Sequence, residues 1–253
     1  IHKKDDFVKT VALAKEAGFS DINADIMYGL PGQMQEQYLE TLRFAAEQGV
    51  THVSAYSLIL EEGTPLEHMV MQGKAALPNE DAVADMEDAG RELLEQLGYE
   101  RYEISNYAKQ GFRCRHNVNY WENGEWLGLG AAAHSAKGTG GVRVRAANTE
   151  DIQAYIRGKN ERTEEKLTCR DEMFETVMLG LRMTDGLLLK DFENRFGSPL
   201  ESVYPGRIAE LKRNGWLNEY AYASGRLALN ARGLDFENAA VLLVMAEQEN
   251  GHG

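Results

Sequence analysis

Apolar and polar positions along the first hundred residues follow two alternating periods. Apolar side chains recur at helical spacing in residues 7–14, 38–46 and 83–97. They alternate with polar side chains in residues 22–27 and 52–59, as they do in strands, and residues 99–108 predict a third strand. Strands and helices that alternate at this length form right-handed parallel crossovers. We therefore expect three parallel strands with helices on one side only.

Three such units make only part of a barrel, because a complete eight-unit barrel takes about 250 residues. The first strand would then keep an unpaired edge, and unpaired strand edges invite association. We therefore expect the chain to dimerise or aggregate through residues 22–27. Asp5 and Asn79 are expected to cap helices, and the sequence at residues 29–33, GLPGQ, predicts a tight turn.

Asp25 lies in the middle of the first predicted strand, on the same face as Asn23 and Met27. An acid at such a position is costly to bury without a hydrogen-bond donor. Asp25 therefore either pairs with a basic side chain or accepts hydrogen bonds from a ligand. The strand pattern leaves both possibilities open.

The pattern changes after Ala136. Residues 137–141 predict a hairpin turn between two strands, and a short helix (149–157) and a charged linker (158–166) follow. The remaining segments outline a small winged-helix-like domain. It would contain three helices at residues 171–182, 187–197 and 206–217, and two strands around Ser224-Gly225 in residues 218–233.

Charge and hydropathy exclude several classes of partner. The formal net charge of -13 disfavours binding to phosphate backbones and anionic lipid surfaces. Winged helices often bind DNA through their third helix, but here Glu210 offsets Lys212 and Arg213, so we expect no nucleic-acid partner. No apolar run approaches the roughly 20 residues of a membrane span, and the first ten residues lack the apolar core of a signal peptide. We expect a cytoplasmic protein without membrane insertion.

Residues 112–135 concentrate candidate chemistry, with two histidines and four aromatic side chains. The residues before Trp126 show no repeating pattern of apolar side chains, which predicts a functional loop containing His116. Residues 126–136 are rich in Gly and Ala, which predicts a buried strand that another backbone or a ligand approaches closely. His134 would lie near the end of that strand. Each histidine is either a ligand-binding residue or a hydrogen-bonded structural one.

Four blocks of sequence carry a family resemblance: INADIMYGLPGQ, SAYSLILEEGTPL, YEISNYAKQGFRCRHNVNYW and WLGLGAAAHSAKG. Together they resemble the C-terminal part of the oxygen-independent coproporphyrinogen III oxidase (HemN-like) superfamily of radical SAM proteins. The HNVNYW block is similar to the H-N-x-x-Y-W motif of the HemW-type haem chaperone branch. The resemblance implies an α/β fold in three parts. These are the C-terminal part of a (β/α)6 partial barrel, a helix with a linker, and a winged-helix-like domain: residues 1–148, 149–166 and 167–253.

The resemblance also implies a haem site. His116 matches the histidine proposed as haem iron ligand in the chaperone branch, and a neutral imidazole is a common axial ligand. Asn117 would fix the imidazole or its loop, and Tyr120, Trp121 and Trp126 would flank the flat apolar macrocycle. The implied partners are haem and the apo-haemoproteins that receive it.

Asp25, Ile59 and His134 match positions that line the S-adenosyl-L-methionine (SAM) region in the family. The family also holds a [4Fe–4S] cluster on a C-x-x-x-C-x-x-C loop, which is absent from this sequence. Cys114 and Cys169 lie too far apart to replace it. We therefore expect a piece of a longer protein that performs no radical chemistry alone. Two alternatives remain open: the oxidase itself, which decarboxylates coproporphyrinogen III, and a non-catalytic interaction module.

Overall fold

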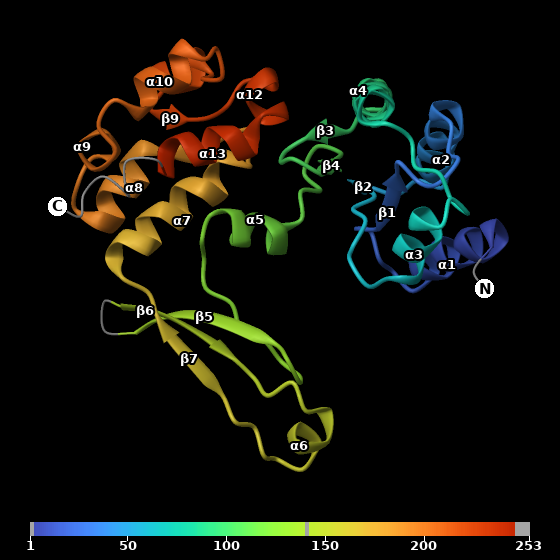
Figure 1. Ribbon diagram of the computed structural model, residues 1–253, viewed down its shortest axis with the longest axis horizontal. Coiled ribbons are helices and arrows are strands. Elements are labelled where there is room, and N and C mark those ends of the chain that lie inside the picture. The colour runs from blue at the N-terminus through green and yellow to red at the C-terminus, as the bar shows by residue number, and fades with distance from the viewer. Residues whose placement is uncertain (1–2, 140–141, 246–253) are drawn as a thin grey trace. The chain divides into compact units, whose positions relative to one another are not determined.

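The computed structural model describes residues 3–139 and 142–245 of the chain. The chain divides into two compact units, residues 1–114 and 115–253 (Figure 1). The first unit contains four helices and four strands in this order: α1 Lys4–Glu16, β1 Asn23–Tyr28, α2 Gln35–Glu47, β2 His52–Ser57, α3 Pro65–Met71, α4 Glu80–Gln96, β3 Glu100–Arg101 and β4 Asn106–Ala108. The predicted domain limits at residues 148 and 166 do not coincide with this division by compactness, and they stay a prediction.

The four strands of the first unit form one mixed sheet in the order β1-β2-β4-β3. β1 and β2 are parallel, as predicted, with Ile26 opposite Ala55. The predicted third parallel strand is wrong, because β4 runs antiparallel to both β2 and β3. Its reversal depends on a turn closed by side chains: the Arg101 guanidinium donates to the Ile104 carbonyl at 2.7 Å, and the Ser105 amide donates to Glu103 at 3.0 Å. Hydrophobic alternation is the same for either strand direction, so it does not report such a turn.

The core of the first unit lies between the sheet and its helices. Ala24 and Ile26 are buried on this face, whereas Asn23, Asp25 and Met27 are exposed on the other, which confirms the predicted alternation. α2 and α4 cross closely at Gly90, where a Cβ atom would lie 2.6 Å from the buried Tyr38 ring. Leu42, Val50, Val53 and Leu94 are among the fully buried residues of this core.

Two local predictions at the starts of helices have different outcomes. The turn at residues 29–33 is confirmed: the Gln33 amide donates to the Leu30 carbonyl at 3.0 Å, and Gly32 has φ +69°, as a type II turn requires. Asp5 does not cap α1. The first turn is closed instead by Asp6, whose carboxylate accepts from the Lys3 amide at 2.9 Å.

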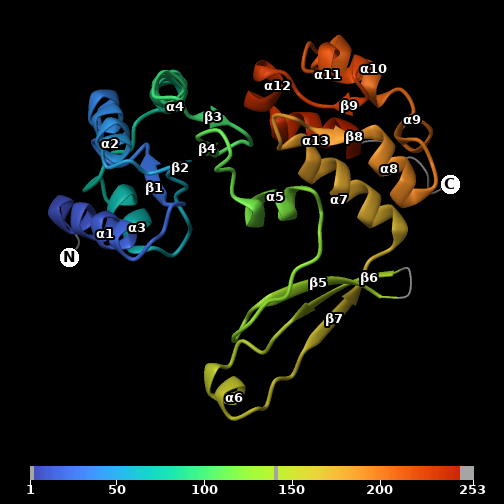
Figure 2. The same cartoon turned by 180° about the vertical axis from the view of Figure 1, so that it is seen from behind.

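The second unit combines a three-stranded sheet with a helical domain (Figures 1 and 2). Its elements are α5 Arg115–Trp121, β5 His134–Thr139, β6 Val142–Ala147, α6 Ile152–Ile156, β7 Thr163–Lys166, α7 Cys169–Leu181, β8 Leu187–Leu188, α8 Leu189–Phe196, α9 Leu200–Val203, α10 Arg207–Arg213, α11 Glu219–Ala223, β9 Arg226–Leu227, α12 Ala231–Asp235 and α13 Glu237–Met245. β5, β6 and β7 are antiparallel in that order. The tip of the predicted hairpin, residues 140–141, lies outside the described residues.

Several predictions for this unit need correction. The segment around His116 is a helix, α5, rather than a loop. Of the expected buried strand at 126–136, only residues 134–136 lie in a strand, β5; Trp126 forms a single bridge to Ala136, and Leu129 is exposed. The expected linker contains β7, whose side chains are all exposed. The first of the two terminal strands is the helix α11, because the Asn218 side chain accepts from the Ala221 amide and starts a helical turn.

Candidate functional site

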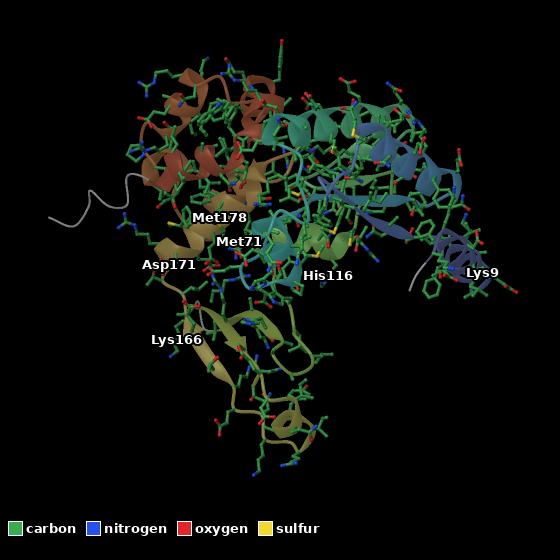
Figure 3. All side chains as sticks on the ribbon, turned by 45° about the vertical axis from the view of Figure 1, so that its right-hand side comes forward. Lys9, Met71, His116, Lys166, Asp171 and Met178 are labelled. Atoms are coloured by element: carbon green, nitrogen blue, oxygen red, sulfur yellow. The ribbon has the colours of Figure 1, made fainter. Side chains whose placement is uncertain are left out.

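Helix α5 divides the HNVNYW block between two faces. Residues four apart lie on one side of a helix, so His116 aligns with Tyr120, and Asn117 aligns with Trp121. The imidazole of His116 is exposed on the helix surface (Figure 3). Among the described residues no hydrogen bond joins Asn117 to His116, so the expected support of the imidazole by this amide is not seen. The motif is therefore two separate pairs of side chains.

The His116 face of α5 carries a continuous aromatic array. The His116 and Tyr120 rings meet edge to face, with centroids 4.8 Å apart and an interplanar angle of 89°. The Tyr120 ring in turn packs on Trp126, with centroids 4.7 Å apart. Trp126 is held by the sheet, because its amide donates to the Ala136 carbonyl at 2.9 Å. This arrangement presents one imidazole beside a large apolar aromatic surface.

Trp121 belongs to the other face and has a different environment. The Arg182 guanidinium lies over its ring, 5.0 Å from the centroid, and the indole Nε1 is buried without a hydrogen-bond partner among the described residues. Arg182 also approaches the Glu237 carboxylate at 3.5 Å, and burial raises the pKa of Glu237. Trp121 therefore packs against Arg182 at the C-terminus of α7, and the structure does not bring it to His116.

The C-terminus of α5 is fixed by residues that the sequence did not single out. Asn123 adopts a left-handed conformation with φ +52°, and the Gly124 amide donates to the Asn119 carbonyl at 2.8 Å, as in a Schellman motif. The buried Arg143 donates to the Asn123 carbonyl at 2.9 Å, and Arg195 donates to the same oxygen at 3.1 Å. The Asn-Gly pair after the helix was the available signal, since such pairs favour positive φ.

His134 begins β5 in the same unit, and its side chain is exposed. A Cβ atom at Gly128 would lie 2.1 Å from the His134 carbonyl oxygen. The close backbone approach expected from the glycine-rich sequence is therefore present, although the long strand is not. In the described part of the chain, no aromatic ring pairs with the His134 imidazole.

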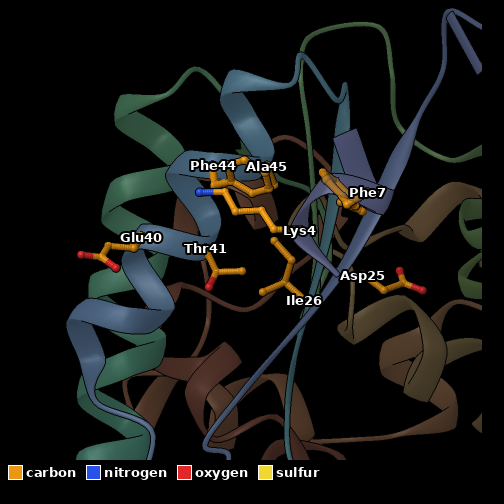
Figure 4. A pocket seen from close by; sticks show the side chains of 9 residues that line it. Lys4, Phe7, Asp25, Ile26, Glu40, Thr41, Phe44 and Ala45 are labelled. Atoms are coloured by element: carbon orange, nitrogen blue, oxygen red, sulfur yellow. The ribbon is translucent and has the colours of Figure 1, made fainter. Parts of the chain in front are cut away.

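Asp25 and Ile59 lie in the first unit. Asp25 projects from the sheet face opposite the helices, and Figure 4 shows its carboxylate directed away from Thr41 and Phe44. It accepts a hydrogen bond from the Asn23 side chain at 2.7 Å, and no Lys or Arg forms a salt bridge with it in the described part of the chain. Ile59 follows β2 and is 76% exposed. The geometry is thus compatible with a carboxylate that accepts from a ligand.

A groove of about 390 Å³ lies on the other side of the same strand, at the free edge of the sheet. Its lining comes from α1, β1 and α2 and includes Phe7, Ile26 and Phe44 (Figure 4). Aliphatic and aromatic carbons dominate these three side chains. The groove therefore continues the apolar core outward past the unpaired strand.

No group of three or more His, Cys, Asp or Glu side chains that could hold a metal ion occurs in residues 3–139 and 142–245. Cys114 and Cys169 are both free thiols. The described residues therefore do not fit an iron–sulfur cluster. No helix within the same ranges is long and apolar enough to cross a membrane.

Comparisons with known proteins give a consistent result. Residues 167–236 match the family model of the HemN C-terminal domain. The fold resembles the solved structure described as coproporphyrinogen III oxidase (HemN) from Escherichia coli, a radical SAM enzyme. The TM-score is 0.75 at 19% identity, over 96% of this chain and 59% of that one. Residues 167–236 therefore belong to the HemN C-terminal domain family, and the predicted fold class is confirmed.

The chain is also similar to haem chaperones named HemW. It is 32% identical to HemW of Bacillus subtilis over 86% of this chain and 58% of that protein. It is 38% identical to HemW of Mycobacterium tuberculosis (strain H37Rv) over 92% of this chain and 58% of that protein. HemW of Escherichia coli is 31% identical over 91% and 61%, respectively. The chain thus spans somewhat more than half the length of these relatives.

Proposed function

We propose that this chain is the haem-binding part of a haem chaperone, which binds haem through His116 and delivers it to apo-haemoproteins. The observation that carries the proposal is the array on α5: an exposed imidazole next to Tyr120, which is backed by Trp126. The similarity to HemW proteins over most of the chain supports the same function.

The residues present fit haem in two respects. A histidine imidazole supplies one axial ligand to the iron, and His116 is exposed where a ligand can reach it. Tyr120 and Trp126 supply apolar aromatic surface for the macrocycle, which is largely hydrophobic. Asn117 and Trp121 would act indirectly, by holding the helix that carries His116.

For the whole protein we infer SAM and a [4Fe–4S] cluster as further cofactors, as in the radical SAM enzyme that shares the fold. Asp25 and Ile59 are the residues of the first unit that we propose for the SAM region. Asp25 would accept a hydrogen bond from a hydroxyl or N–H group of the ligand, because the Asn23 contact occupies only one carboxylate oxygen.

The proposal is tested by titrating the chain with haem and following the Soret band. The His116→Ala variant should lose the spectral shift of ligated haem, because the proposed axial ligand is gone. His68→Ala is the matched control: His68 is also an exposed histidine on a seven-residue helix, and its loss should leave the titration unchanged.

Equal titrations of the parent chain and His116→Ala would overturn haem ligation by His116. If His68→Ala lost the shift instead, the spectrum would report ligation by a surface histidine outside the motif. Transfer to an apo-haemoprotein is then measured by mixing the haem-loaded chain with apomyoglobin and following the change in the Soret band.

A further inference from the structure

Four side chains of the first unit form a continuous series of hydrogen bonds that ends at Asp25. Asn23 Nδ2 lies 2.7 Å from Asp25 Oδ1, and Asn23 Oδ1 lies 2.7 Å from His52 Nδ1. His52 Nε2 lies 2.8 Å from the Tyr102 hydroxyl. Tyr102 and His52 are buried, whereas Asn23 and Asp25 are exposed. The series therefore runs from the interior to the surface.

The chemistry of the groups assigns a direction to each bond. An ionised carboxylate only accepts hydrogen bonds, so the Asn23 amide must turn its Nδ2 towards Asp25. Its Oδ1 then faces His52, and this oxygen can only accept, so His52 Nδ1 must carry a proton. Burial lowers the pKa of His52, which favours the neutral imidazole. In a neutral imidazole with a protonated Nδ1, Nε2 is an acceptor, and the Tyr102 hydroxyl donates to it.

We propose that Tyr102, His52 and Asn23 are positioning residues that hold the Asp25 carboxylate in a fixed orientation for its ligand. This proposal rests on the proposed role of Asp25 in the SAM region. With Oδ1 of Asp25 committed to Asn23, the other carboxylate oxygen is left for a hydroxyl or N–H donor of the ligand. Bonds that all point the same way polarise one another, so the buried end contributes to the order of the exposed end.

The protonation pattern is read from the nitrogen spectrum of the His52 imidazole in the ¹⁵N-labelled chain. Near neutral pH, Nδ1 should show a protonated, pyrrole-type signal and Nε2 an unprotonated, pyridine-type signal. The Tyr102→Phe variant keeps the aromatic ring but removes the donor to Nε2, so the Nε2 signal should move to the position of an acceptor without a hydrogen bond, while Nδ1 stays protonated by its contact with Asn23. A purely structural role for the Tyr102 ring would leave the Nε2 signal unchanged.

Tyr99→Phe is the matched control. The Tyr99 hydroxyl is also a buried donor in the same unit. It donates to the Val50 carbonyl at 2.6 Å and takes no part in the hydrogen bonds that lead to Asp25. Tyr99→Phe should leave the His52 signals in place. A proton on Nε2 of His52 in the parent chain would overturn the proposal, and so would unchanged signals in Tyr102→Phe.

Ligand affinity separates this proposal from the proposed function. SAM is titrated against the chain by saturation-transfer NMR, and Asp25→Asn should weaken binding by about tenfold or more, as expected for a lost charged hydrogen bond. Tyr102→Phe should weaken it by about twofold to fivefold, and Tyr99→Phe should not. Unchanged binding in Asp25→Asn would remove the ligand role of Asp25. If Asp25→Asn lost affinity for SAM and Tyr102→Phe did not, only the positioning role of Tyr102, His52 and Asn23 would be overturned.

Discussion

Arg143 and Asn123 are 20 positions apart in sequence, yet the Arg143 guanidinium donates to the Asn123 carbonyl at 2.9 Å at the C-terminus of α5. A second guanidinium nitrogen of Arg143 donates to the Gly124 carbonyl at 2.6 Å. Asn123 and Gly124 lie just after α5, and backbone carbonyls at such a turn need a donor when they are withdrawn from water. The helix that carries His116 is thus held in place by β6.

The first prediction tests this anchor. Arg143→Met should lower the free energy of unfolding by about 2–3 kcal/mol, because it leaves the Gly124 carbonyl without its donor and the Asn123 carbonyl with Arg195 alone. Arg213→Met serves as control, since Arg213 is exposed and pairs only with the partly exposed Glu210, and its loss should stay within about 0.5 kcal/mol. Both are measured by urea unfolding. Equal stability of the two variants would contradict an anchoring role.

The second prediction separates the two tryptophans of the haem site. Trp126→Ala should weaken haem binding and keep the spectrum of ligated haem, since it removes aromatic surface behind Tyr120 but not the imidazole. Trp121→Ala should mainly lower the free energy of unfolding, by about 3–5 kcal/mol, because Trp121 packs under Arg182. Haem affinity is measured for each variant by a titration that follows the Soret band, and the free energy of unfolding is measured by urea unfolding. A larger loss of haem affinity in Trp121→Ala than in Trp126→Ala would reverse the assignment.

The sequence was informative where a feature depends on neighbouring residues. Alternation correctly placed Asp25 on the strand face opposite Ala24 and Ile26, because side chains of a strand alternate between faces wherever the strand lies in the sheet. The HNVNYW block predicts His116 as a haem ligand through its family resemblance, and this role stays a prediction.

What depends on tertiary contacts could not be read in advance. The antiparallel direction of β4 is seen only in its pairing with the distant strand β2, where Asn106 lies opposite Ser54. Likewise, α5 has only seven residues, a length that is marginal for an isolated helix, so its packing against α7 and its anchored C-terminus stabilise it. The helix places Trp121 and His116 on different faces. The sequence predicted a loop here, and a loop imposes no such separation, so both residues were assigned to one site.

The third prediction concerns pH. Burial lowers the pKa of His52 in the folded chain below its ordinary value of 6.5, with the Asp25 carboxylate acting in the opposite direction. The unfolded chain therefore binds more protons than the folded chain once the pH falls below 6.5, and the free energy of unfolding should decrease with falling pH. The slope for one such group is at most about 1.4 kcal/mol per pH unit, and it ends below the pKa of the folded state.

The comparison that isolates His52 is the slope of stability against pH, measured by urea unfolding at a series of pH values. His52→Phe should lose this part of the slope, whatever its absolute stability. His68→Ala should keep it, because His68 is exposed on α3. Parallel curves for the parent chain and His52→Phe would show that His52 does not release its proton on folding.

The fourth prediction concerns the free edge of β1. The Tyr28 carbonyl accepts from Leu58 and the Ile22 carbonyl from His52, so the even-numbered residues of the strand bond to β2. In a parallel pair, the backbone groups of residues 23, 25 and 27 then face the open edge. We expect the chain to associate through this edge in a concentration-dependent manner, which sedimentation velocity measures directly.

Met27→Pro should suppress association and preserve the fold, because it removes an N–H that β2 does not use, and proline is tolerated on edge strands. Ile26→Pro is the contrasting variant: it removes an N–H directed at β2 and should destabilise the sheet itself. A parent chain that stays monomeric at every concentration would refute the prediction, as would association that persists in Met27→Pro.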